Sequence, residues 1–173
     1  SWHEPPAGAQ QVLRLDPGLA FGTGTHPTTR MCLRWTARHG AQGQRVLDYG
    51  CGSGILAMGA AKFGAREIVA VDIDPAAVES TRLNAENNHV QLQSGLPDLA
   101  QGEFDLVLAN ILATPLKVLA PLLCAHVKAG GHLVLAGILA RQADELREAY
   151  APWVQLSVSD EEDGWILMTA QRA

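Results

Sequence analysis

VLDYGCGSGI, residues Val46–Ile55, joins a short apolar strand to three glycines at every second position. The Ala-rich segment Ile55–Phe63 follows at once and predicts a buried helix that ends at Gly64. Glycines in such a turn permit a tight bend and let a ligand approach the backbone, because they carry no Cβ atom. The stretch therefore indicates either a nucleotide-like ligand at this turn or only a tight connection from strand to helix.

Strands and helices alternate along the rest of the chain, which predicts an α/β fold with a doubly wound, mostly parallel sheet. The apolar strands indicate burial on both faces of that sheet. Strands are expected at Val46–Tyr49, Glu67–Asp72, His89–Gln93, Phe104–Ala109 and Gly130–Ile138, with a closing hairpin of Val154–Ser159 and Trp165–Ala170. Because no helix separates the two strands of this hairpin, the last strand should run antiparallel.

Several helix starts carry recognisable capping residues. Asp74 precedes Pro75, which predicts a helix start because the aspartate accepts from free backbone N–H groups and proline is tolerated at the first helical position. Thr114 and Pro115 repeat this pattern, and Thr28 is the expected N-cap of the first helix. The helices are expected at Thr28–Arg38, Ile55–Phe63, Asp74–Asn88, Thr114–Lys128 and Arg141–Tyr150.

The composition is that of a soluble globular protein. Hydrophobic residues make up 47% of the 173 residues and charged residues 18%. No apolar run approaches the length of about 20 residues that crosses a bilayer, so we expect no membrane contact. The net charge of −5 argues against direct nucleic-acid binding and suits a basic protein partner. We expect a monomer.

The three cysteines, Cys32, Cys51 and Cys124, are widely spaced and odd in number. They form neither a CxxC pair for zinc nor a disulfide framework, which favours a reducing compartment. No signal peptide is visible. We therefore expect a cytoplasmic protein with no metal site.

The position of the glycine turn favours a cofactor site. In a doubly wound sheet, ligands bind beyond the carboxyl ends of the strands where the strand order reverses, and Asp72 ends the next strand, where a carboxylate accepts hydrogen bonds from ribose hydroxyls. Asp48 beside the turn repels a pyrophosphate but suits the positive sulfonium of S-adenosylmethionine. These residues favour S-adenosylmethionine. A nicotinamide dinucleotide is the alternative, because the turn also fits G-x-G-x-x-A with an acid about 20 residues on.

Five segments carry a more specific signal. They are LDPGLAFGTGTHPTT (Leu15–Thr29), LDYGCGSGILA (Leu47–Ala57), VDIDPAAV (Val71–Val78), ANILATPL (Ala109–Leu116) and GILARQADE (Gly137–Glu145). Together they resemble the ribosomal protein methyltransferases (PrmA type) that modify protein L-eleven of the large ribosomal subunit. The resemblance implies a seven-stranded class I S-adenosylmethionine-dependent methyltransferase fold. It also implies methylation of the N-terminal amine and lysine side chains of that protein, with S-adenosylhomocysteine as product.

Composition and the resemblance together predict the domain organisation. Residues 1–25 are expected to form a linker and a glycine-rich loop, with a short strand at Gln11–Leu15. Residues 26–173 are expected to form the Rossmann-like catalytic domain. Family members carry an additional small N-terminal domain that recognises the substrate, and we expect that domain to be absent here while cofactor binding survives.

The resemblance places cofactor contacts on Thr29, Gly50, Asp72 and Asn110. Asn110 ends its predicted strand over the site and can accept a hydrogen bond from the substrate amine, so it is also the candidate catalytic residue. The full set of expected cofactor-binding residues is Thr28, Thr29, Asp48, Gly50, Gly52, Gly54, Asp72 and Asn110.

From Asn110 the chain reads NILA, where many amino-methylating relatives carry Asn/Asp-Pro-Pro-aromatic. This difference argues against the planar amine of adenine or glutamine as target and fits a lysine or a terminal amine. The alternative is an amine on another protein or on a small molecule. His26 either acts as general base or only orders its loop. The acidic turn Asp160–Asp163 is expected to be a solvated hairpin tip, and attraction of a basic ribosomal protein is the alternative.

Overall fold

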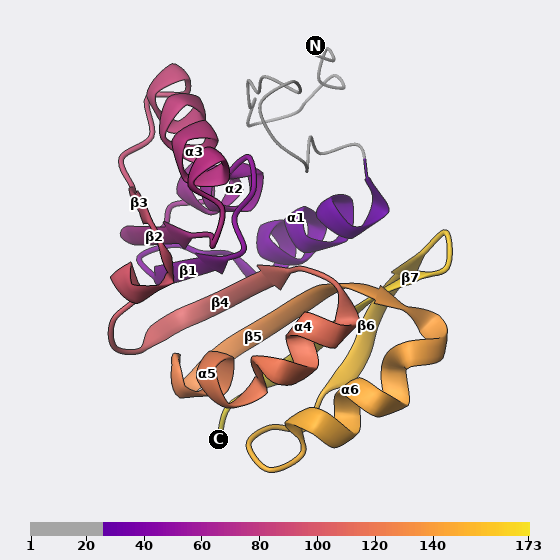
Figure 1. Ribbon diagram of the computed structural model, residues 1–173. Helices are drawn as coiled ribbons and strands as arrows, with labels where there is room; N and C mark the ends of the chain where they lie inside the picture. The colour runs from indigo at the N-terminus through magenta and orange to yellow at the C-terminus, as the bar shows by residue number, and fades with distance from the viewer. Residues whose placement is uncertain (1–25) are drawn as a thin grey trace.

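Seven strands and six α-helices alternate along residues 26–173, the part of the chain that this computed structural model describes (Figure 1). The strands are β1 (Arg45–Tyr49), β2 (Glu67–Val71), β3 (Gln93–Gly95), β4 (Phe104–Asn110), β5 (Val127–Leu139), β6 (Ser157–Glu162) and β7 (Trp165–Gln171). The helices are α1 (Pro27–His39), α2 (Ile55–Lys62), α3 (Pro75–Asn87), α4 (Ala113–Val118), α5 (Ala120–Ala125) and α6 (Ala143–Tyr150), with short 3₁₀ turns at Pro97–Leu99 and Ala140–Gln142. Within this range, no helix is both long and apolar enough to cross a membrane. The predicted linker, glycine-rich loop and strand of residues 1–25 lie outside it.

The strands form one sheet in the order β3-β2-β1-β4-β5-β7-β6. All neighbouring pairs are parallel except the two that include β7, which runs antiparallel to β5 and to β6. Strand β1 is an interior strand, because Leu47 pairs with Val69 of β2 on one side and with Val107 of β4 on the other. The predicted doubly wound, seven-stranded sheet with an antiparallel last strand is confirmed.

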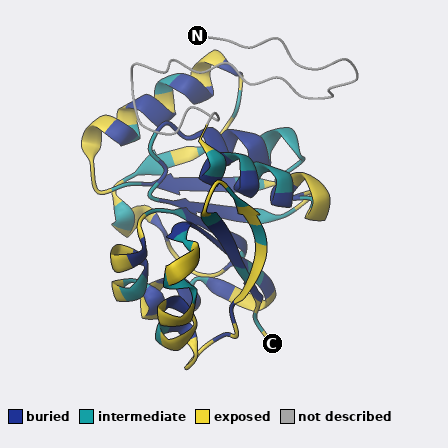
Figure 2. Cartoon of the chain, turned by 90° about the vertical axis from the view of Figure 1, so that its right-hand side faces the viewer, coloured by how far each residue is buried: buried dark blue, intermediate teal, exposed yellow. Residues whose placement is uncertain are grey.

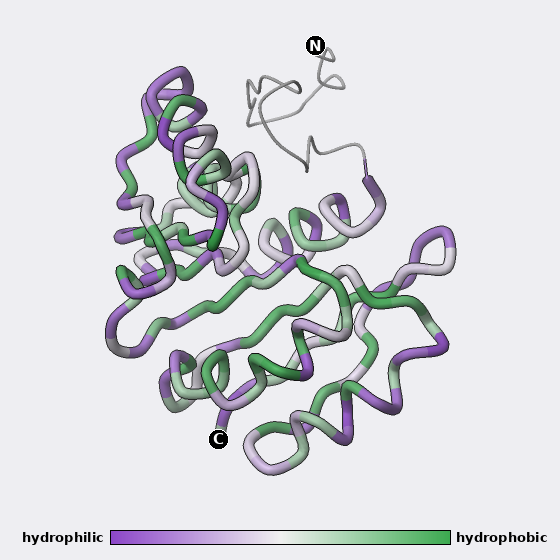
Figure 3. Tube along the Cα trace, in the orientation of Figure 1, coloured by the Kyte–Doolittle hydropathy of each residue, from purple (hydrophilic) through white to green (hydrophobic). Residues whose placement is uncertain are grey.

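Two apolar cores hold the helices against the two faces of this sheet. One core packs α4, α5 and α6 against side chains such as Leu47 and Val107, and the other packs α1 and α2 against Val46 and Ala70. Helix α3 lies beside α2 (Figure 1). The central strands are buried along most of their length (Figure 2) and largely hydrophobic (Figure 3), as both faces of a covered parallel sheet must be.

The helix predicted over Thr114–Lys128 differs from the structure in its start and in its continuity. Leu112, and not Thr114, is the residue before the first helical one. The segment then breaks at Leu119 into α4 and α5. Pro121 explains the break, because proline lacks the N–H that would continue the helix and its ring crowds the preceding turn.

The third strand begins later than the predicted His89–Gln93, because the end of α3 uses the first of these residues. His89 has a φ of 57°, and the N–H of Val90 donates to the carbonyl oxygen of Ala85 at 2.8 Å. A left-handed residue with such a backward hydrogen bond terminates a helix. Only three residues, Gln93–Gly95, remain for β3.

The closing hairpin has a tighter turn than predicted. Asp163 and Gly164 form it, with φ values of 53° and 83°, as an Asp-Gly type I′ turn requires. Asp160 and Glu162 lie in β6 and form ion pairs with two arginines of α1. Neither a solvated tip nor an acidic surface open to a basic partner therefore describes these two carboxylates.

The two N-cap predictions have different outcomes. Asp74 caps α3 as predicted, since its side chain accepts from the N–H of Ala76 at 2.9 Å. The prediction for Thr28 is wrong, because His26 is the N-cap of α1 and its Nδ1 accepts from the N–H of Thr28 at 3.2 Å. A ring nitrogen here satisfies the orphan N–H group that a hydroxyl was expected to satisfy.

Replacing Asp74 with alanine should lower the free energy of unfolding by about 1 kcal/mol, because the N–H of Ala76 loses its acceptor. Asp74→Ser keeps a capping oxygen and should unfold close to the wild type. Urea unfolding followed by circular dichroism compares the three proteins. Equal midpoints for the wild type and the alanine variant would contradict the capping role.

Candidate functional site

The carboxyl ends of β1, β2 and β4 meet at one edge of the sheet (Figure 1). There the Gly50–Gly54 turn connects β1 to α2, and the strand order reverses because β2 and β4 lie on opposite sides of β1. Open α/β sheets bind ligands at such a switch point. Asp72 follows β2 and Asn110 ends β4 at this same edge, as the sequence predicts.

The glycine turn is tied through its N–H groups to the end of β2. The N–H groups of Gly50 and Cys51 both donate to the carbonyl oxygen of Val71, at 2.8 and 2.9 Å. The N–H of Gly52 donates to Oδ2 of Asp72 at 3.0 Å, and Oδ1 of the same carboxylate accepts from the backbone N–H two residues further on, also at 3.0 Å. Two backbone N–H groups thus orient Asp72, which is half-buried at the sheet edge.

Two buried polar side chains of α3 hold the carbonyl groups of the same turn. Thr81 Oγ1 donates to the carbonyl oxygen of Gly52, and Asn84 Nδ2 donates to that of Ser53, each at 3.0 Å. A Cβ atom on Gly54 would lie 2.8 Å from Cγ2 of Thr81, so only glycine fits there. Neither Thr81 nor Asn84 was predicted from the sequence. Their signal was two polar residues three positions apart on the face that α3 buries.

Asp48 lies beneath the turn and is only 1% exposed. Its Oδ2 accepts from the N–H of Ala57, in the first turn of α2, at 3.1 Å. Burial raises the pKa of Asp48 to about 7, and the nearby negative charge of Asp72 adds to the increase. The carboxyl is therefore poised to exchange a proton near neutral pH. Its role opposite a sulfonium stays a prediction, and a cation placed nearby would favour the ionised form.

Thr29 and Asn110 meet at this edge although 81 residues separate them. Asn110 Nδ2 donates to Thr29 Oγ1 at 3.4 Å. Thr29 is buried and Asn110 is half-buried. Because the amide nitrogen faces Thr29, the amide oxygen Oδ1 is the atom left to accept a hydrogen bond from another group.

The polar groups of Thr28 are directed at His26. The N–H of Thr28 donates to His26 Nδ1 at 3.2 Å, and the Thr28 hydroxyl lies 2.8 Å from the same nitrogen. A nitrogen that accepts from a backbone N–H carries no proton, and its lone pair is already used. The geometry therefore favours a structural role for His26 over that of a general base acting through Nδ1. A cofactor contact by Thr28, which is 4% exposed, stays a prediction.

The NILA segment packs against the glycine turn through Ile111. A Cβ atom on Gly50 would lie 2.6 Å from Cγ2 of Ile111, and a Cβ atom on Gly137 of β5 would lie 2.2 Å from its carbonyl oxygen. Gly137 also has a φ of +88°, which L side chains rarely adopt. Glycine at these two positions lets the chain after Asn110 pass between the turn and β5. This role of Gly137 was not predicted from the sequence.

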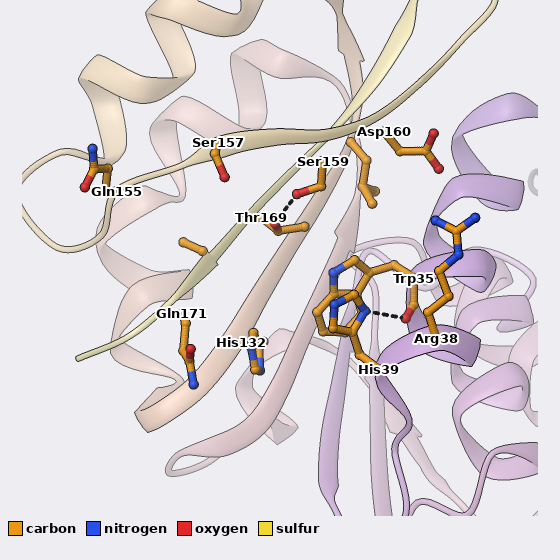
Figure 4. Close-up of a pocket in the computed structure, with 12 residues that line it drawn as sticks. Trp35, Arg38, His39, His132, Gln155, Ser157, Ser159, Asp160, Thr169 and Gln171 are labelled. Atoms are coloured by element: carbon orange, nitrogen blue, oxygen red, sulfur yellow. Dashed lines mark hydrogen bonds between the residues drawn. The ribbon is translucent and has the colours of Figure 1, made fainter.

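A groove of about 440 Å³ lies between α1 and the strands β7 and β6 (Figure 4). Its walls include Trp35 and His39, whose rings stack at a centroid distance of 4.0 Å, and His132 of β5. His132 lies four residues before Ala136, the residue of β5 that pairs with Asn110. The groove is therefore displaced toward the amino end of β5, and none of the expected cofactor-binding residues lines it.

The strand order, the single antiparallel strand and the polar residues around a glycine turn at the switch point define the class I methyltransferase fold. A ribosomal protein L11 methylase from Lactobacillus delbrueckii subsp. bulgaricus matches with a TM-score of 0.88 and 33% identity, over 98% of this chain and 90% of that one. A T. thermophilus 16S rRNA methyltransferase in complex with AdoMet and guanosine matches with a TM-score of 0.73. That match has 22% identity over 89% of this chain and 45% of the other, so it supports the fold alone.

Comparison by sequence narrows this class to one family. The sequence model of the ribosomal protein L11 methyltransferases (PrmA) matches residues 1–173. Relatives of that name from Polaromonas sp. and Ralstonia pickettii are 73% and 57% identical, over 99% and 97% of this chain. The chain belongs to the ribosomal protein L11 methyltransferase (PrmA) family, which confirms the resemblance of the five segments. It spans 58% and 57% of the length of these two relatives.

Gly137→Ala should destabilise the fold by about 2–4 kcal/mol, because the new methyl group overlaps Ile111 and the residue keeps a strained φ. Gly130→Ala is the matched control in the same strand. Gly130 has a φ of +81° with nothing within 4 Å of its added Cβ, so it should lose only about 1 kcal/mol. Denaturant unfolding measures both, and equal losses would show that the contact with Ile111 is not a constraint.

Asp48 should add a pH dependence to folding that Asp48→Asn removes. Because its pKa rises from 3.8 to about 7 on folding, the folded chain binds this proton more tightly, and stability falls as pH rises from about 4 to about 7. The fall should be on the order of 2–4 kcal/mol. In Asp48→Asn the amide oxygen can still accept the hydrogen bond from the N–H of Ala57, but the side chain no longer titrates. Free energies of unfolding at about pH 5 and about pH 8 test this. A difference between wild type and variant that stays constant with pH would refute it.

Proposed function

We propose that this chain transfers methyl groups from S-adenosylmethionine to the N-terminal amine and lysine side chains of ribosomal protein L11. The observation that carries the proposal is the meeting of Thr29, Asp72 and Asn110 around a glycine turn at the switch point of the sheet. Membership of the PrmA family supports the proposal, since its relatives are named for methylation of L11.

The residues at the turn fit S-adenosylmethionine. Asp72 presents a half-buried carboxylate at the end of β2, where it suits the two ribose hydroxyls. The carboxylate of Asp72 suits a sulfonium and opposes the pyrophosphate of a nicotinamide dinucleotide, and Asp48 adds to this where a nearby cation favours its ionised form. When bound, the cofactor supplies a methyl group activated by its positive sulfur, and S-adenosylhomocysteine is the product. The proposed contacts are Thr28, Thr29, Asp48, Gly50, Gly52, Gly54, Asp72 and Asn110.

We assign the orientation of the substrate amine to Asn110. With its Nδ2 on Thr29, its Oδ1 can accept a hydrogen bond from an amine at the sheet edge. A lysine must lose a proton before it attacks, which costs about 4–5 kcal/mol from a pKa near 10.4 at pH 7. Desolvation at the site lowers the pKa of an amine, and a neighbouring positive charge acts in the same direction. We therefore assign no side chain as an obligatory general base.

We propose residues 26–173 as the catalytic domain and the cytoplasm as its compartment. The sheet and both of its helix layers are formed within this range. Cys32, Cys51 and Cys124 are buried and form no disulfide, as a reducing compartment favours.

Calorimetric titration of the chain with S-adenosylmethionine, S-adenosylhomocysteine and NADH tests the cofactor. The first two should bind and NADH should not. Asp72→Ala should weaken the binding of S-adenosylmethionine at least about tenfold, because it removes about 1.4 kcal/mol or more of interaction. Asp144→Ala, on the exposed face of α6, is the matched control and should bind like the wild type.

Incubation with S-adenosylmethionine and purified L11, followed by mass spectrometry of its N-terminal and lysine-containing peptides, tests the acceptor. Binding of NADH in place of S-adenosylmethionine would overturn the cofactor assignment. Binding of S-adenosylmethionine without methylation of L11, but with methylation of another amine, would overturn the substrate assignment.

A further inference from the structure

Helix α1 and strand β6 are joined by a network of four charged side chains. Arg30 Nε donates to Oε2 of Glu162 at 2.7 Å, and a second nitrogen of the same guanidinium contacts that oxygen. Arg34 reaches Oε1 of Glu162 at 2.9 Å through Nη1 and Oδ2 of Asp160 at 3.0 Å through Nη2. Glu162 therefore bridges two arginines that lie one helical turn apart, with one oxygen for each.

This network is better placed than an isolated surface pair to hold the helix. The two carboxylate side chains are 22–23% exposed and the two arginines 37–38%. The hydrogen bond from Arg30 and then that from Arg34 lower the pKa of Glu162, so its charge persists across the neutral range. Networks of several partly buried charges stabilise more than single exposed pairs do.

The other strand of the hairpin also contacts the start of α1. Trp165, the first residue of β7, meets the ring of His26 edge to face at a centroid distance of 5.2 Å. His26 in turn caps α1 through the N–H of Thr28. Both strands of the hairpin thus reach the first turns of α1. In the sheet, β6 is separated by β4, β5 and β7 from β1, the strand that follows α1 in the chain.

The contact between Thr29 and Asn110 is weak. Its distance of 3.4 Å is longer than the 2.7–3.2 Å range of ordinary N–H···O bonds, so it is too weak to position α1 by itself. Thr29 directly precedes Arg30, the residue that the hairpin holds. Apolar packing holds the body of α1 against the sheet, and the contacts on the hairpin side restrain its first turns, where Thr29 lies.

We propose that the closing hairpin is a positioning device for the cofactor site, in which Glu162 holds Arg30 and Arg34 and so keeps Thr29 against Asn110. Glu162 is thus a positioning residue. Within residues 26–173, Glu162 forms no hydrogen bond or ion pair with the glycine turn or with Asn110. The inference rests on the proposed cofactor site, but its structural half, the tethering of the start of α1, can be measured without a ligand.

Two variants break the network from opposite ends, Glu162→Gln and Arg30→Met. In calorimetric titration of the whole chain, each should weaken S-adenosylmethionine binding about three- to tenfold. Because both changes break the same network, the affinity of the double variant should equal that of the single variant that binds less tightly. Glu145→Gln is the matched control, since it breaks the 3.2 Å ion pair between Lys117 of α4 and Glu145 of α6 in the opposite helix layer. It should leave the affinity unchanged.

Hydrogen exchange of the ligand-free proteins gives the second measurement. Glu162→Gln should speed the exchange of amides over residues 27–34 relative to wild type and to Glu145→Gln. Unchanged exchange there would overturn the tethering whatever the ligand result. Wild-type binding of S-adenosylmethionine with equal affinity in all variants, even at a lower melting temperature, would reduce the hairpin to a merely structural role. No binding by the wild type would instead contradict the proposed function.

Discussion

The backbone of the Gly50–Gly54 turn is held from two directions, and the site takes its geometry from this restraint. Three of its N–H groups donate to Val71 and Asp72 at the end of β2, and two of its carbonyl groups accept from Thr81 and Asn84 of α3. A buried backbone group without a partner costs free energy comparable to a lost hydrogen bond. The turn therefore cannot slide in either direction without leaving such groups unpaired.

Close packing carries the same restraint to the next strand. The side chain of Ile111 packs against Gly50, and its backbone packs against Gly137. A methyl group on either glycine would overlap Ile111. Protein interiors respond to one added methylene because they are packed like crystals. The direction in which Asn110 leaves β4 is thus set by two glycines, one in the turn and one in β5. The turn determines which class of ligand site forms here, whereas this packing determines where the side chain of Asn110 lies.

Charge is used differently on the two sides of α1. Asp48, on the inner side, is buried with one backbone hydrogen bond and forms no ion pair within residues 26–173, so burial raises its pKa. Glu162, on the hairpin side, faces two guanidinium groups and stays ionised. The inner carboxyl is sensitive to a positive charge that arrives at the site. The outer carboxylate is suited to hold a helix in place across a wide range of pH.

Local chemistry made much of this molecule predictable. The alternation of apolar strands and helices predicted the parallel sheet, and the unseparated closing pair predicted its antiparallel strand. The cap at Asp74 and the glycine turn between β1 and α2 were also predicted correctly, since such signals act over a few residues. The break before Pro121 was equally local, and the cap-and-proline pattern at Thr114 obscured it.

The sequence by itself determined the fold class, the place of the glycine turn and the family. It did not show that Thr81 and Asn84 turn inward to the carbonyl groups of the turn, because a polar residue on a helix usually faces solvent. Only the tertiary structure decided that Glu162 meets Arg30, 132 residues away. Such a contact depends on the order in which strands lie in the sheet, and no short stretch of sequence encodes that order.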